Sequence, residues 1–162
     1  VCSSDLMAFD ISAVEEHTLA ALRAYERAGD LRNVCAQSAV MGIAAERAGK
    51  FESAAHWQRQ ACDLAARLRL PMYLGMSQSS LARTHFAQGE RERGLAEARE
   101  AVERLARTGE SRLLAVARAG LAAMQFTVGD LDAAWSEADR AFAIGHLAPA
   151  VRQHSQIGRA HV

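Results

Sequence analysis

Cysteine and histidine are the side chains of this sequence that could bind a metal or act as nucleophile and base. Away from the chain ends the cysteines are Cys35 and Cys62, which are too far apart to form the Cys-x-x-Cys pair typical of zinc sites. The histidines never recur at the four-residue spacing of a helical metal site; those away from the ends are His17, His56, His85, His146 and His154. The sequence therefore predicts no metal site. We expect reduced, structural thiols and a His85 that packs between helices.

One segment partly matches a catalytic motif. Gly75-Met76-Ser77-Gln78-Ser79 begins like the Gly-x-Ser-x-Gly nucleophile turn, but the last glycine is missing and no strand precedes it. There is no glycine-rich dinucleotide motif, and Lys50, the only lysine, does not lie in a phosphate-binding loop. We therefore expect no catalytic residue, no cofactor and no enzymatic activity in this segment.

The charge pattern gives no sign of nucleic-acid or membrane binding. The 162 residues carry 19 basic and 19 acidic side chains, so the formal net charge is zero. In the most basic stretch, 91–107, glutamates are interleaved with the arginines, which is typical of a solvated helix with internal ion pairs. No stretch of the sequence is long and uncharged enough to span a membrane. We expect a cytoplasmic protein, and we expect this segment of it to contact neither nucleic acid nor membrane.

The two ends of the chain have an unusual relation to each other. A back-translation of residues 1–6 has a reverse complement that encodes Gln156-Ile157-Gly158-Arg159-Ala160-His161. Ligated adapters that are read through at both ends have this property, and the two strings resemble translated sequencing adapters. We therefore expect residues 1–6 and 157–162 to be adapter artefacts and exclude them from fold and function. Residues 7–156 are then a fragment, of metagenomic character, of a longer protein.

The sequence between these ends repeats with a period of 40 residues. Gly49, Gly89 and Gly129 mark the period, and it divides the chain into a half unit, 11–30, and units 31–70, 71–110 and 111–150. Small residues recur in three columns around these glycines. The columns are Gly42, Ala82 and Ala122; Ala54, Gly94 and Ala134; and Ala61, Ala101 and Ala141.

Each unit has the pattern of two helices. Apolar residues recur at steps of three and four, and a glycine followed by a polar residue separates one helix from the next. We expect helices over 12–28, 32–48, 51–69, 72–88, 91–107, 111–128 and 131–145, with Pro149 opening another. Small columns let helices approach closely, which favours stacked helix pairs. A closed helical bundle is the alternative, although a bundle does not require a repeat.

These columns resemble the tetratricopeptide repeat (TPR) family. That family has small residues at the positions of Gly42, Ala54 and Ala61 around a turn glycine, and a large residue at the position of Met41. The resemblance covers about residues 11–155 and implies an all-α fold, a right-handed α-solenoid of antiparallel helix pairs. It is incomplete, because the family's mid-helix aromatic is replaced by Ala45, His85 and Gln125, and the units are longer than the family's 34 residues.

The long, alanine- and arginine-rich units are also similar to the repeat regions of large bacterial regulators of the ATP-dependent LuxR type. The resemblance implies a protein-protein interaction scaffold, a fragment of a larger regulatory protein that binds a partner protein or peptide. Two alternatives remain open. The segment could be the effector-sensing repeat region of such a transcription regulator, with a small effector as its ligand, or the accessory repeat region of an enzyme whose catalytic domain lies elsewhere.

In the family, the first helix of each unit lines the concave face. Carried over by column, the resemblance implies a partner-binding stripe formed by Ile43, Glu46, Met76, Ser79, Arg83, Phe86, Val116 and Phe126. Phe86 and Phe126 would be apolar anchors, and Arg83 would bind an acid or a carbonyl. The alternative is that the two phenylalanines pack between units. We expect Trp57 and Trp135, on second helices, to be packing residues.

The end units of such an array lack a neighbour on one side. Their apolar columns should therefore be exposed, which predicts marginal stability or self-association through the uncapped ends.

Overall fold

The fold was analysed in a computed structural model, which describes the backbone of residues 11–157 and the side chains of residues 16–144. Within this range the chain forms seven helices and no strand, so the prediction of an all-α chain is confirmed. The helices are α1 (Ile11–Ala28), α2 (Leu31–Arg47), α3 (Phe51–Arg67), α4 (Pro71–Ala87), α5 (Arg91–Ala106), α6 (Ser111–Thr127) and α7 (Leu131–Ile157). Residues 1–10 and 158–162, which hold most of the expected adapter segments, lie outside the described residues.

The expected helix boundaries agree closely with the structure, with one exception. We expected a helix end near residue 145 and a new helix at Pro149, but α7 continues as one helix to Ile157. Each of the six earlier helices is followed by a residue with a positive φ angle, whereas no such residue occurs near residue 145. Without that left-handed residue the chain has no means of reversing, so the helix continues.

Left-handed residues end the helices within the repeat. The five turn glycines have φ angles between 70° and 94°, and Arg69 takes the same role with a φ of 54°. At Gly49 the next backbone N–H, that of Lys50, donates to the carbonyl of Ala45, which is the bond that closes a helix in the Schellman motif. The same six-to-one bond recurs at Glu90 and Asp130. The prediction that these glycines separate one helix from the next is confirmed.

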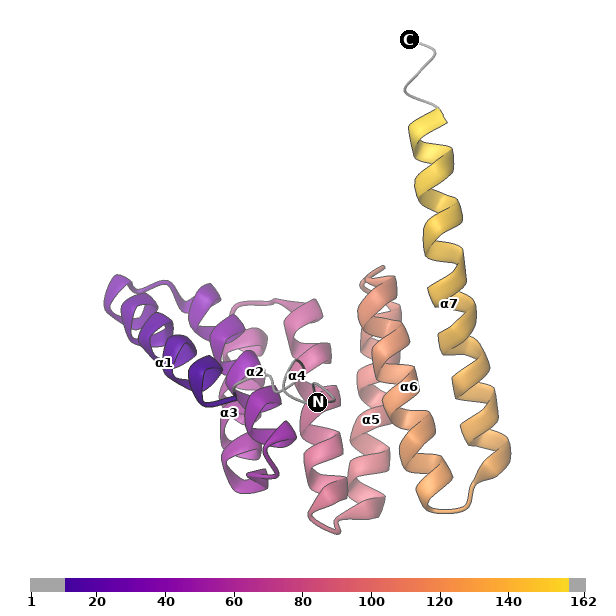
Figure 1. The fold of residues 1–162 in the computed structure, drawn as a ribbon, viewed down its shortest axis with the longest axis horizontal. Coiled ribbons are helices and arrows are strands. Elements are labelled where there is room, and N and C mark those ends of the chain that lie inside the picture. Colours follow the sequence, from indigo (N-terminus) through magenta and orange to yellow (C-terminus); the bar gives the residue numbers. More distant parts are fainter. Residues whose placement is uncertain (1–10, 158–162) are drawn as a thin grey trace, which may run out of the picture.

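The helices follow one another in a row. Each helix contacts the next in the sequence, and the first helices of the units, α2, α4 and α6, also contact one another in order. No contact of this kind joins α3 to α5 or α5 to α7 within the described range. Figure 1 shows the helices arranged in order from α1 to α7, with the last turns of α7 extending beyond the other helices.

Two apolar clusters hold the row together. One joins Val34 and Cys35 of α2 to Leu64 and Ala65 of α3, with Tyr73 of α4 against it. The second brings together α4, α5 and α6, and its buried members are Ala82, Ala98, Val102, Leu105, Ala117, Leu121 and Met124. Because each cluster includes residues from two successive units, the units share their cores.

The small columns lie where helices touch. Ala54, Ala61, Ala82 and Ala101 are completely buried. At Gly94 the contact is with the backbone of the neighbouring helix, because a Cβ atom there would lie 2.7 Å from the carbonyl oxygen of Ala82. That oxygen belongs to the α4 backbone and cannot move aside, so α5 approaches α4 this closely only with glycine at position 94.

A pair of glycine substitutions tests this spacing. We expect Gly94→Ala to lower the free energy of unfolding by about 2 kcal/mol, because the added methyl group overpacks the α4–α5 contact. Gly120→Ala is the matched control, since its Cβ atom would lie 3.5 Å from Cδ of Arg83, an ordinary contact. The control should gain about 0.5–1 kcal/mol, since alanine is the better helix former. Chemical denaturation measures both, and equal effects would contradict the close approach at Gly94.

Candidate functional site

The predicted partner-binding stripe lies on three neighbouring helices. Ile43 and Glu46 belong to α2, Met76, Ser79, Arg83 and Phe86 to α4, and Val116 and Phe126 to α6. We call the side of the molecule formed by α2, α4 and α6 the first-helix face. The eight residues differ in environment. Ser79 is buried, Val116 and Phe126 are 57% and 68% exposed, and the other five are half-buried.

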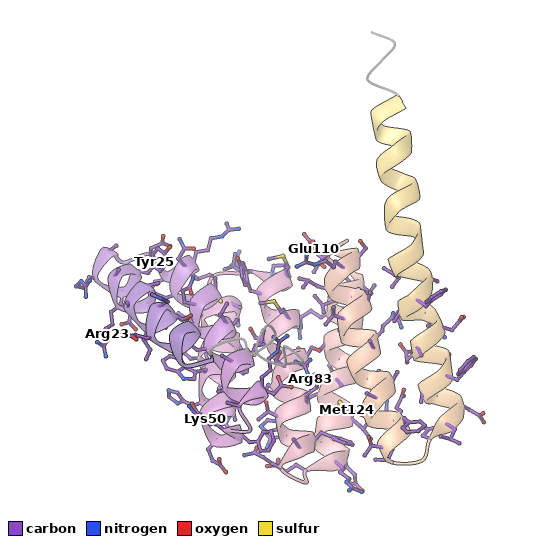
Figure 2. The ribbon with its side chains drawn as sticks, in the orientation of Figure 1. Arg23, Tyr25, Lys50, Arg83, Glu110 and Met124 are labelled. Atoms are coloured by element: carbon purple, nitrogen blue, oxygen red, sulfur yellow. The ribbon has the colours of Figure 1, made fainter. Side chains whose placement is uncertain are left out.

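Arg83 and Glu46 form the strongest polar contact on the first-helix face. The guanidinium Nε donates to Oε1 of Glu46 at 2.8 Å and Nη2 donates to Oε2 at 2.9 Å, a bidentate pair between α4 and α2. Nη2 also donates to the hydroxyl of Ser80 at 3.0 Å. Arg83 lies midway along the row of helices in Figure 2. The pair therefore fixes the guanidinium plane and joins two successive units.

Part of the Arg83 guanidinium is left available. Its Nη1 lies 3.8 Å from where a Cβ atom of Gly120 would be, so this nitrogen is directed toward α6. Among the described residues no acceptor is bound to Nη1, whose two hydrogens are donors. The absence of a side chain at Gly120 leaves space beside them. A carbonyl or carboxylate that lies between α4 and α6 would meet these donors.

Phe86 and Phe126 occupy equivalent columns but not equivalent environments. Phe86 packs against the cluster between α4, α5 and α6, and its Cβ lies 2.9 Å from where a Cβ of Gly94 would be. Phe126 is exposed at the end of α6. Phe86 is thus a packing residue, whereas Phe126 is accessible to a partner.

The two tryptophans also differ. Trp57 is half-buried, but Trp135 is 78% exposed. The prediction that Trp135 is a packing residue is therefore wrong within the described residues. Its column in α5 holds Leu95, which α6 covers, but no described helix covers the same side of α7.

His85 is part of a polar network inside the α4–α5 pair. Its ring is completely buried, as expected, and Nδ1 lies 2.6 Å from Oε2 of Glu97. Because a carboxylate accepts hydrogen bonds, the shared hydrogen lies on Nδ1. The other oxygen of Glu97 accepts from Arg93, which also pairs with Glu90 at the surface. Among the described residues His85 Nε2 has no hydrogen-bond partner, so Glu97 is the only one of them in polar contact with the ring.

Two substitutions, one of each glutamate, test the buried part and the exposed part of this network separately. We expect Glu97→Ala to lower the free energy of unfolding by about 2 kcal/mol, because it leaves the buried imidazole without any partner. Glu90→Ala, which removes the exposed partner of the same arginine, should leave the unfolding midpoint unchanged. Thermal and denaturant unfolding of the two variants make the comparison. Equal losses would mean that the His85 contact contributes nothing beyond the surface pair.

The thiols are held in unreactive surroundings. Cys35 is buried and its Sγ donates to the carbonyl of Ala61 at 3.4 Å. Burial raises the pKa of the Cys35 thiol. Burial, and then the charge of Asp63, raise the pKa of the Cys62 thiol to about 12. Both groups are free thiols, and a nucleophile needs the thiolate that these surroundings disfavour.

The remaining catalytic signals lie inside a helix. Gly75, Ser77 and Ser79 are buried residues of α4, so the segment that partly matches the nucleophile motif is not a strand-to-helix turn. No group of three metal-ligating side chains comes together among the described residues. The side chains of His146 and His154 lie outside those residues.

An open cleft lies near the start of the row of helices. Its volume is about 440 Å³, and it is formed where the end of α1 and the start of α2 meet α3. The lining residues are Glu26, Leu31, Val34, His56, Arg59, Gln60, Asp63, Leu64 and Arg67. The sequence pattern did not predict this cleft, because it depends on where three helices meet and its polar residues look like an ordinary solvated surface.

Comparisons with known proteins leave the interpretation to the structure. No model of a known protein family matches the chain, and no curated protein is recognisably similar to it. None of the described helices is long and apolar enough to span a bilayer.

Proposed function

We propose that this chain is a non-enzymatic protein-protein interaction scaffold, a slice of a right-handed solenoid of antiparallel helix pairs that binds a partner protein or peptide on the first-helix face. Within the described residues, α4 contacts both α2 and α6, whereas the second helices do not contact one another. In a curved row the elements on the inner side are the ones that come close together. This difference in spacing is the observation that carries the proposal, because it favours a concave first-helix face.

The chemistry of that face suits a polypeptide ligand. The guanidinium of Arg83 lies near its centre, held by Glu46 and with Nη1 directed toward α6. The neighbouring first helices each carry an exposed apolar side chain, Val40 on α2 and Phe126 on α6. A fixed arginine between apolar contacts is a common composition of energetically important interface residues. The ligand we propose has a carboxylate or a main-chain carbonyl for Nη1 and an apolar side chain for Phe126.

Glu46 already occupies two of the donors of Arg83, which determines how a ligand is recognised. A ligand acid adds to the pair through Nη1 and does not have to replace Glu46. The pre-formed pair also holds the long arginine side chain in one conformation. Binding then costs less conformational entropy than it would with a free arginine.

A charge swap distinguishes a binding role of Arg83 from a purely structural one. Peptides that bind the whole chain are first selected from a displayed random library. Their affinities are then measured for Arg83→Glu, for Phe126→Ala and for the double variant Glu46→Arg, Arg83→Glu. We expect Arg83→Glu to weaken binding about tenfold or more, since it removes the donor and opposes Glu46 with a second carboxylate. The double variant Glu46→Arg, Arg83→Glu re-forms an ion pair of reversed direction and should recover thermal stability but not affinity.

Two results would contradict the proposal. If the double variant recovers affinity together with stability, then Arg83 serves only to join α2 and α4. If the selection yields no peptide, or only peptides whose binding ignores both Arg83→Glu and Phe126→Ala, then the first-helix face is not the binding site.

A further inference from the structure

The cleft between α1, α2 and α3 has an apolar patch formed by Leu31, Val34 and Leu64. Val34 and Leu64 belong to the apolar core between α2 and α3. Leu31 is 40% exposed, although α1 lies before its helix in the row and α3 lies after it. Its counterparts in the next two units are Pro71 and Ser111. Of the three units, only the first therefore has a leucine at this position.

The repeat shows how the same position is filled one unit later. There Arg104 takes the place of Leu64, and its Nε donates to the amide oxygen of Gln78 at 3.1 Å. The amide nitrogen of Gln78 donates in turn to Oε2 of Glu100 at 3.0 Å, so these side chains bridge α4 and α5. The hollow at that junction has a volume of about 310 Å³ and is lined by residues between 65 and 74, and by none of α5.

This bridge does not form in the first unit, because two of its residues are different. Ser38 stands in the column of Gln78, and its hydroxyl donates to the carbonyl of Val34 at 2.8 Å, within its own helix. Leu64 stands in the column of Arg104 and has no hydrogen-bond donor on its side chain. The cleft is thus a feature of this unit's own sequence. The helices α2 and α3 both have a neighbouring helix on either side.

Hydrogen-bonding side chains line the cleft on α3, closer to the start of that helix than Leu64. They are His56, Arg59 and Gln60, which we call the polar end. None of the three makes a hydrogen bond or an ion pair with another described residue. The pKa of Glu90 is lowered chiefly by its bond with Arg93 and least by Arg59, so Arg59 is not committed to that acid. A guanidinium has five N–H donors and binds a carboxylate with two of them.

The acidic side chains of the cleft leave the polar end positive. Glu26 lies near the end of α1, five residues before Leu31, so it belongs to the apolar patch and not to the polar end. Asp63 lies four residues from Arg59 and four from Arg67, so its charge is shared between the two arginines. Two arginines against one aspartate give the α3 side of the cleft a net positive charge.

We propose that this cleft binds a small amphipathic carboxylate, with its acid group at the polar end and its hydrocarbon part on the apolar patch. The cleft's volume of about 440 Å³ is within the range of small-molecule sites. Arg59 and Leu64 are five residues apart on α3, about 8 Å along the helix axis, so the hydrocarbon part needs several carbons. A cation of the same shape would face Arg59 and fits less well. The cleft shares no residue with the predicted partner-binding stripe.

Tryptophan emission provides a direct test. The ring of Trp57 lies edge-on to that of His56, with 5.4 Å between the ring centroids. In a Trp135→Phe variant of the whole chain Trp57 is the only tryptophan, so its emission reports on the polar end. The probe is decanoate, titrated below its micelle concentration. Decylammonium has the same tail with the opposite charge, and acetate has the charge without the tail. We expect saturable binding of decanoate, and binding of the other two that is about tenfold weaker or worse.

Matched substitutions of exposed residues locate the bound acid. Arg59→Glu should weaken decanoate binding about tenfold, whereas Arg99→Glu, in the same column one unit later, should leave it unchanged. Leu31→Ala should also weaken binding, because it shortens the apolar patch. Val40→Ala shortens a side chain of the same helix that is equally exposed but does not line the cleft, so it should have no effect.

Three results would overturn the proposal. They are the absence of saturable decanoate binding, decylammonium binding as tight as that of decanoate, and equal decanoate affinity of Arg59→Glu and Arg99→Glu. Arg83→Glu, which tests the first-helix face, should leave decanoate binding unchanged. The cleft and the first-helix face are therefore tested separately, and either proposal can fail while the other holds.

Discussion

The closeness of one helix to the next is the constraint on which the rest of the structure depends. At Gly94 the α5 backbone lies so near the carbonyl oxygen of Ala82 that a methyl group does not fit. The completely buried alanines on α3, α4 and α5 provide similar close contacts along the row. Since helices this close share their apolar side chains between units, the cores are continuous and the stability of each unit depends on its neighbours.

This spacing also explains the geometry of the first-helix face. On the first-helix face, α2, α4 and α6 are near enough for Arg83 to reach Glu46 on one side and Gly120 on the other. A single side chain thereby joins α2 to α4, lies beside α6 and presents two donors that no described residue binds.

Much of the fold was predictable from the sequence, because the repeat is visible in residues that have local effects. Gly49, Gly89 and Gly129 predicted where helices end, and the small columns predicted where helices touch. The long α7 was not predicted, since Pro149 suggested the start of a new helix. The polar part of the core was also missed. Gln58 is completely buried beneath Gly42, which has no side chain and so leaves room for it, and this pairing depends on two helices meeting. The stripe on the first helices was assigned by column, but the Arg83–Glu46 pair depends on the distance between units, which no column reveals.

Residue-level hydrogen exchange on the whole chain tests the dependence on neighbours most directly. The α4–α5 pair has α3 on one side and α6 on the other, whereas residues 131–144 of α7 contact α6 alone among the described helices. We predict that amides in α4 and α5 exchange slowest and that those of residues 131–144 exchange markedly faster, with α6 between them. Equal protection of α4, α5 and residues 131–144 would contradict it, because stability would then not depend on the neighbouring unit.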